Sequence, residues 1–412
     1  MVALRVAVLA DIHSDQNGGS WTHVYAEPPA ARPGHNPLAD LVSFVRSEGI
    51  NADYLLAVGD IANRANAVGL EYGWRRAHGL AADLGAHLLG VPGNHDVVTH
   101  DEVADPREAL RALLPGFPTG DTRLDDHFWT RGWALIENAD HRVLLIDSTL
   151  DFPPHPGAVR KNSKAWREYL KVIDRGGFLD RVEDEISEAL AGLGEKLNIA
   201  VVHHHPMEHQ FQGWLQDEYG PMRRGSELVE LLAKSTQSGR WLMVHGHKHV
   251  PQLVQATNLT SNGPIVLCGA SIGAKLWDPI NTVTRNQFHI MTVRNDYDEA
   301  VPGLAGTIES YTWGYGIGWQ VSERSGSGLP AAAGFGSNEH FRVLATKVER
   351  ALGADASAFM SYEALLGAVP QLPYVLPADW EFLESELEQR GVGFSRDRAN
   401  RLVQISRIGA KA

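Results

Sequence analysis

Residues 4–13 read Leu-Arg-Val-Ala-Val-Leu-Ala-Asp-Ile-His, an apolar run that ends in a carboxylate and an imidazole. A short run rich in Val and Leu is typical of a buried strand. Asp11 and His13 lie two positions apart, so an extended chain points both side chains to the same side. The stretch therefore predicts a core strand that delivers two metal-ligating groups at its carboxyl end.

The same arrangement recurs along the chain. Four further predicted strands run into the motifs Gly59-Asp60, Gly93-Asn94-His95-Asp96, His203-His204-His205-Pro206 and Gly246-His247-Lys248-His249. Open α/β sheets place their sites at the carboxyl ends of strands, because the loops leave the sheet together there. We expect these side chains to meet at one edge.

Periodicity gives the wider fold class. Strands are predicted at 4–10, 54–58, 87–91, 134–137, 143–147, 199–204, 241–245, 264–267 and 288–293, and helices at 38–48, 70–84, 107–113, 179–191 and 226–234. This alternation predicts an α/β protein. Two later alternating stretches, 307–313 and 319–322, are expected to complete a second sheet.

Composition narrows the function. The 412 residues carry a formal net charge of −13, which opposes the attraction behind non-specific nucleic-acid binding, so long nucleic acid is a poor substrate guess. No apolar run approaches the ~20 residues of a membrane span. Cys268 is the single cysteine, which excludes an internal disulfide and predicts a buried strand residue. We expect a cytoplasmic protein that does not span a membrane.

In the order of these five motifs the sequence resembles the calcineurin-like metallophosphoesterase superfamily, over residues 1 to about 320. The resemblance implies a two-sheet sandwich flanked by helices and two divalent transition metals, such as Mn, Fe or Zn. The implied ligands are Asp11, His13 and His249 for the first metal, Asn94, His204 and His247 for the second, and Asp60 shared by both. The family's His-x-Pro spacing selects His204, and His205 is the alternative ligand. His203 is expected either to pack in the core or to support a ligand from behind.

The resemblance also implies a reaction. A metal-bridging hydroxide would attack phosphorus, His95 would act as general acid or transition-state stabiliser, and Asp96 would orient His95. The doubled His-His-Pro most resembles the cyclic-nucleotide phosphodiesterase type, so we expect a small anionic phosphodiester, such as a cyclic or linear nucleotide. A phosphomonoesterase, a DNA nuclease of the same superfamily and a non-catalytic metal-binding scaffold are the alternatives.

Domain organisation follows from composition. Residues 1–322 are expected to form the metallophosphoesterase domain, 323–337 a linker, and 338–412 a mainly helical tail for packing or homo-oligomerisation, with helices at 340–352 and 379–390. Two insertions, near 16–37 and 151–176, are either solvated excursions or loops that contact substrate. The candidate substrate-binding residues are Trp21, His23, Tyr25, His205 and Trp214.

Overall fold

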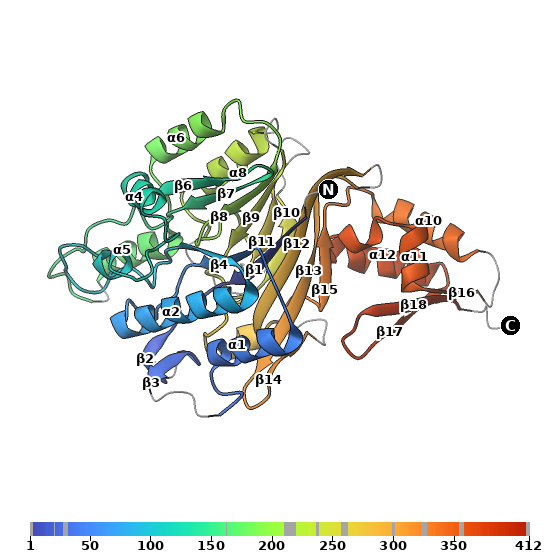
Figure 1. Ribbon diagram of the computed structural model, residues 1–412, viewed down its shortest axis with the longest axis horizontal. Helices are drawn as coiled ribbons and strands as arrows, with labels where there is room; N and C mark the ends of the chain where they lie inside the picture. Colours follow the sequence, from blue (N-terminus) through green and yellow to red (C-terminus); the bar gives the residue numbers. More distant parts are fainter. Residues whose placement is uncertain are drawn as a thin grey trace.

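The computed structural model describes residues 3–19, 21–27, 32–161, 163–209, 220–235, 239–256, 263–298, 301–322, 328–353 and 358–408. Two sheets stack face to face, and helices cover the outer face of each (Figure 1). The expected fold class, a two-sheet α/β sandwich with a small C-terminal unit, is confirmed.

Strand β1, near the start of the chain, lies in the interior of the first sheet between β12 and β4. The order of this sheet is β14-β13-β12-β1-β4-β5. The seventh strand, β15, also pairs with β13. The strands are β1 (Ala3–Leu9), β4 (Tyr54–Val58), β5 (His87–Val91), β12 (Asn286–Asp298), β13 (Val301–Gly314), β14 (Gly318–Val321) and β15 (Ala332–Phe335). The two late strands expected to complete the second sheet thus extend the first sheet instead, through antiparallel pairing with β12.

The second sheet has the order β10-β11-β9-β8-β7-β6. Its strands are β6 (Trp133–Glu137), β7 (His141–Ile146), β8 (Leu197–Val201), β9 (Trp241–His245), β10 (Gln252–Gln255) and β11 (Ile265–Cys268). Cys268 is buried at the end of β11, as predicted. The strands β7, β8 and β9 run parallel, so their carboxyl ends open at one edge.

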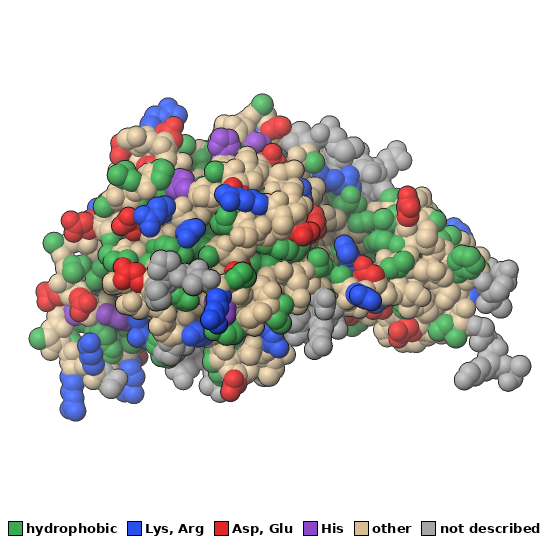
Figure 2. Space-filling model, turned by 60° about the horizontal axis from the view of Figure 1, so that its bottom comes forward, with side chains coloured by type: hydrophobic (Ala, Val, Ile, Leu, Met, Phe, Trp, Pro, Cys, Tyr) green, Lys and Arg blue, Asp and Glu red, His purple; other side chains and the backbone are tan. Residues whose placement is uncertain are grey.

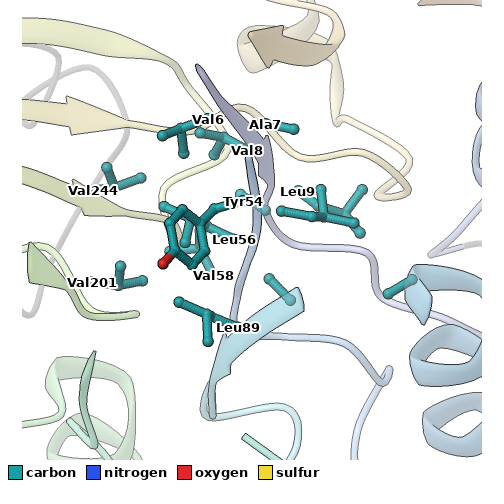
Figure 3. Close-up of a cluster of buried hydrophobic side chains, with 14 of the residues drawn as sticks. Val6, Ala7, Val8, Leu9, Tyr54, Leu56, Val58, Leu89, Val201 and Val244 are labelled. Atoms are coloured by element: carbon teal, nitrogen blue, oxygen red, sulfur yellow. The ribbon is translucent and has the colours of Figure 1, made fainter. Parts of the chain in front are cut away.

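The core between the sheets explains their stacking. Alternate side chains of β1 leave on opposite sides: Val6 and Val8 face Val201 and Val244 of the second sheet, while Leu9 points away, toward the helices (Figure 3). All five are almost completely buried. Because both faces of β1 are covered from Val6 to Leu9, that part of its sequence is apolar throughout.

Helices close the outer faces. Those on the first sheet are α1 (Pro37–Glu48) and α2 (Ala67–Leu84), and those on the second are α6 (Asp180–Leu190) and α8 (Gly225–Lys234). The other helices that the structure describes before the tail are α3 (Glu108–Arg111), α4 (Thr122–Arg131), α5 (Lys164–Arg175) and α9 (Asp278–Asn281). Local sequence sets the ends of α1: Asn36 caps the amide of Ala39, and Gly49 adopts a left-handed φ of 62°.

Both insertions contain regular structure. The first forms the short parallel pair β2 (Asp15–Asn17) and β3 (Tyr25–Glu27), and the second contains α5. Helix α5 is amphipathic, and Trp166, Tyr169 and Ile173 form its buried side.

The C-terminal region is a separate small core beside the first sheet (Figure 1). Its elements are α10 (Phe341–Leu352), β16 (Phe359–Ser361), α11 (Tyr362–Ala368), η2 (Leu372–Tyr374), α12 (Pro377–Gln389), β17 (Val392–Arg396) and β18 (Leu402–Arg407). The short η2 turn contacts β13 and β15 of the first sheet. Strand β15 itself lies within the 323–337 stretch that the sequence suggested as a linker.

Charges of both signs are mixed on the face of the molecule that Figure 2 draws. Within the part of the chain that the structure describes, no helix has both the length and the apolar character required to cross a membrane.

Candidate metal centre

Polar side chains from both sheets meet at the strand ends. Asp11, Asp60 and Asn94 follow β1, β4 and β5 of the first sheet, whereas the histidine run follows β8 and His247 and His249 follow β9 of the second. The described His and Asp side chains form adjoining groups whose ligand atoms lie within 4.8 Å of one another. In the structure the motifs thus lie together at the strand ends, where the sequence predicted that they would meet.

The backbone at these positions adopts an unusual conformation. Asp11, His13, Asp60, His247 and His249 all have positive φ, between 49° and 74°. Such values are uncommon for residues other than glycine and cluster at functional sites, where neighbouring structure holds them. Here the loops brace each other, because the His13 amide donates to the Asp60 carbonyl at 2.8 Å.

The first group consists of Asp11, His13 and His249. Nε2 of His13 lies 3.0 Å from Nε2 of His249, and the latter lies 3.6 Å from Oδ1 of Asp11. Atoms bound cis to one ion at about 2.1 Å lie roughly 3 Å apart, so this spacing suits a shared metal.

Asp60 lies between the two groups. Its Oδ2 is 3.6 Å from Nε2 of His13, and its Oδ1 is 3.4 Å from Nε2 of His203. The His95 amide donates to Oδ1 at 2.8 Å and fixes the carboxylate. A Cβ on Gly93 would lie 2.2 Å from Oδ1, which explains why glycine precedes Asn94.

The second group consists of His203, His204 and His247, next to Asn94. Nδ1 of His203 contacts the Val58 carbonyl at 2.8 Å, so the ring proton lies on Nδ1 in the neutral form. The Nε2 lone pair then faces Oδ1 of Asn94 at 3.2 Å as well as Asp60. His203 was not predicted to be a ligand from the sequence. In the structure it faces Oδ1 of Asn94 and Oδ1 of Asp60, two of the predicted ligands.

His204 is held from the other side. Its Nδ1 lies 2.7 Å from the Ser148 hydroxyl, and its Nε2 is buried without a hydrogen-bond partner among the described residues. Gly176 packs directly on the ring, since a Cβ there would come within 2.3 Å of Nδ1. The sequence reasoning missed Ser148; its position directly after the β7 residues 141–146 and Asp147 was the available signal.

His205 and His95 occupy different positions. His205 is buried and stacks on His247, with ring centroids 5.7 Å apart and planes inclined by 12°. His95 packs edge-on against His13 at 4.8 Å, and its Nδ1 accepts the Arg64 amide at 3.3 Å. Burial lowers the pKa of His95, and Asp60 opposes this shift.

Asp96 contacts backbone rather than the His95 ring. Its Oδ1 accepts the Ala62 amide at 2.7 Å, and its Oδ2 accepts the Gly93 amide at 2.9 Å. Burial, followed by the charge of Asp60, raises the pKa of Asp96 to about 7. Asp96 was predicted to orient His95; in the structure its carboxylate instead joins the loop after Asp60 to the loop before His95.

The candidate substrate residues are dispersed. Trp21 is 62% exposed, and the Arg64 guanidinium lies 5.2 Å from its ring centroid. His23 packs on Trp313 at 4.9 Å, and burial lowers its pKa to about 4. Tyr25 begins β3, and Trp214 lies outside the described residues. Arg64, four residues after Asp60, was not considered from the sequence.

The residues present fit a pair of metals. Oδ1 of Asn94 and Oδ1 of Asp60 converge on Nε2 of His203, and Nε2 of His204 has no hydrogen-bond partner among the described residues. Burial by itself lowers the pKa of His203, but the neighbouring charge of Asp60 outweighs it and raises that pKa to about 9, so this point favours positive charge. Burial is the largest cause that lowers the pKa of His13, His204 and His247, so these imidazoles are neutral, as metal binding requires. Mixed imidazole and carboxylate ligands suit divalent transition metals.

A two-sheet α/β sandwich with adjoining His/Asp groups at its strand ends defines a dinuclear metallohydrolase. The family model for calcineurin-like phosphoesterases matches residues 4–259, and the chain belongs to this family. It is therefore a dimetal phosphoesterase. A second family model, wHTH-Calcineurin_assc, matches residues 333–389 and identifies the C-terminal region as a winged helix-turn-helix unit.

Several solved structures are similar at low identity. A dimetal phosphatase from Danio rerio shares 14% identity over 76% of this chain and 99% of its own, with a TM-score of 0.44. Purple acid phosphatase PPD1 from yellow lupin seeds shares 15% over 78% of this chain and 52% of its own, with a TM-score of 0.45. Calcineurin-like phosphoesterase YfkN from Bacillus subtilis shares 13% over 93% and 99%, with a TM-score of 0.36. No curated protein matches the chain.

Proposed function

We propose that the protein hydrolyses a small phosphodiester, such as a cyclic or linear nucleotide, with two divalent transition metals held between its sheets. The observation that carries this proposal is the position of Asp60, which turns one carboxylate oxygen to each ligand group. A shared carboxylate suits two ions about 3.5–4 Å apart, the spacing of two-metal phosphoesterases.

The proposed ligands follow the two groups. Asp11, His13 and His249 hold the first metal, and Asn94, His203 and His247 hold the second, with Asp60 shared. His203 takes the place that the His-x-Pro spacing gives to His204, because its Nε2 lies within 3.4 Å of both Asn94 Oδ1 and Asp60 Oδ1. His204 is the alternative ligand.

The protein side chains then position the reaction. When bound, the metal pair lowers the pKa of water and stabilises negative charge on the phosphoryl oxygens. The Arg64 amide donates to Nδ1 of His95, which leaves the ring proton on Nε2. His95 is thereby ready to donate a hydrogen bond to the leaving oxygen, a contribution of roughly 10²–10⁴-fold for a positioned donor.

The mouth of the site supports a small ester with a flat group. The exposed ring of Trp21 lies against the Arg64 guanidinium, and the Arg64 amide contacts His95. An aromatic surface beside a cation suits a base or an aryl group linked to phosphate. The net charge of −13 disfavours a long polyanion in the same place.

Hydrolysis of matched aryl esters tests the proposal. With Mn²⁺-loaded protein, we expect a higher kcat/KM for bis(p-nitrophenyl) phosphate than for p-nitrophenyl phosphate. His95→Asn should retain both metals and lose at least ~10²-fold in kcat, because the imidazole that positions a donor at the leaving oxygen is removed while the proposed metal ligands stay. A higher kcat/KM for the monoester would defeat the diesterase proposal and favour the phosphomonoesterase alternative.

The winged helix-turn-helix unit raises the nuclease alternative, but its surface does not favour DNA. In modules that read DNA, the second helix of the motif enters the major groove through its N-terminal end. Here that helix is α12, whose charged residues are Asp379, Glu381, Glu384, Glu386 and Glu388. The preceding η2 turn packs on β13 and β15. Metal-dependent degradation of single- or double-stranded DNA would reverse this ranking.

A further inference from the structure

The inserted helix α5 ends directly beside the second ligand group. Tyr169 anchors the helix through a hydrogen bond to the Thr99 carbonyl at 2.9 Å. Beyond its last residue, the Gly177 amide donates to the Ser148 carbonyl at 2.8 Å, and the Arg223 amide donates to the Gly176 carbonyl at 3.2 Å. The end of α5 is thus fixed on both sides, with Gly176 against the His204 ring.

This anchoring places one carboxylate at the metal centre. Asp174, in the last turn of α5, has Oδ2 at 3.9 Å from Nε2 of His247. The separation is too long for a hydrogen bond. It lies within the ~3.0–4.2 Å expected between two atoms bound to one ion at about 2.1 Å. The Asp174 side chain is 37% exposed, so solvent reaches this carboxylate.

We propose that Asp174, on the inserted helix α5, is a third carboxylate of the metal centre and a ligand of the second metal. Its charge favours phosphodiesters over phosphomonoesters as substrates. The selectivity part rests on the proposed function. Neither the motif order nor the His-x-Pro spacing points to this residue.

The selectivity follows from charge. Two divalent ions are partly neutralised by Asp11 and Asp60, and a third carboxylate removes one more positive charge. A phosphodiester carries one negative charge at neutral pH, whereas a phosphomonoester approaches two. Each unit of charge at the centre therefore changes the attraction of the monoester about twice as much as that of the diester. Asp174 disfavours the dianion.

Metal binding tests the first part without relying on turnover. Chelator-treated wild type, Asp174→Asn and the control Glu168→Gln are titrated with Mn²⁺ by calorimetry. Glu168 is exposed on the same helix, so the control removes the same charge away from the centre. We expect Asp174→Asn to weaken the second binding step ~10–100-fold, with the first step and the control unchanged. An unchanged second step would overturn the proposal.

Substrate preference tests the second part. The ratio of kcat/KM for bis(p-nitrophenyl) phosphate to that for p-nitrophenyl phosphate is measured at saturating Mn²⁺. We expect the ratio to fall ~10-fold in Asp174→Asn and to recover in Asp174→Glu. A ratio that does not fall would overturn the charge selection. A wild type that prefers the monoester would instead defeat the proposed function. In that case the calorimetric titration would still test whether Asp174 is a metal ligand.

Discussion

At the scale of single residues, the histidine run gives three neighbours three different environments. His203 faces Asn94 and Asp60, His204 contacts Ser148, and His205 stacks on His247. The sequence reasoning extended the strand to residue 204 and therefore alternated the side chains. Strand β8 ends at Val201, so strand alternation does not apply to the run.

The first prediction separates the two candidate ligands. We expect His203→Ala to weaken binding of the second metal ~10–100-fold, because it removes a nitrogen that faces both Asn94 and Asp60. His204→Ala should have the smaller effect. Metal content after dialysis against a weak chelator, measured by elemental analysis, compares the two variants. The opposite order would restore the His-x-Pro assignment.

Sequence was sufficient for the place of the site and insufficient for its finer contacts. Apolar runs mark buried strands, and the motifs follow these runs, so the meeting of Asp11, Asp60 and His249 was predictable. Ser148 and Asp174 carry no motif, and their contacts depend on how α5 and the loop after β7 pack. Such contacts are set by tertiary structure rather than by spacing.

At the scale of elements, the sequence of α5 has helical periodicity, but no helix was predicted there from the sequence. Trp166, Tyr169 and Ile173 recur at helical spacing, although a Pro-rich stretch and many basic residues surround them. Partner strands were harder to predict, because an alternating pattern does not say which strand lies beside it. That is why β13 and β14 were placed in the wrong sheet.

The second prediction concerns the contact of η2 with β15. A Cβ on Gly334 would lie 1.8 Å from the Pro373 carbonyl oxygen. Gly334→Ala should therefore loosen the C-terminal region at a cost of about 1–3 kcal/mol of unfolding free energy. We expect faster hydrogen exchange at the Ser337 amide, which donates to the Tyr374 carbonyl at 2.9 Å.

Gly367 offers a matched control within the same region. It is exposed in α11, and nothing lies within 4 Å of a Cβ placed there. Gly367→Ala should leave exchange at Ser337 unchanged, and by helix propensity it gains up to about 1 kcal/mol. Equal exchange in the two variants would show that the contact does not hold the region in place.

At the scale of the whole molecule, stability depends on groups far from the metals. His289 on β12 is completely buried, with Nδ1 at 2.9 Å from the Ser310 hydroxyl. Burial lowers its pKa to about 3, below the usual histidine value of 6.5. The folded state therefore binds fewer protons than the unfolded chain between these values, and this contribution to stability is lost as pH falls.

The third prediction follows from that sign. Between pH 7.5 and pH 5, protonation of His289 in the unfolded chain should lower the free energy of unfolding by about 2 kcal/mol. Urea unfolding of metal-free wild type and His289→Gln at both pH values measures this difference. The variant should lose correspondingly less stability, and an equal loss in both proteins would contradict the assignment.

The division of the metal ligands between two sheets has a consequence during synthesis. Carboxylate and amide groups from β1, β4 and β5 leave the ribosome well before the imidazoles that follow β8 and β9. A growing chain that lacks the later strands lacks His249 of the first ligand group and His203 and His247 of the second, and an incomplete ligand set binds a cation weakly. If these residues hold the metals, we expect metal acquisition to follow translation past His249 and closure of both sheets, so that the ions enter an assembled protein.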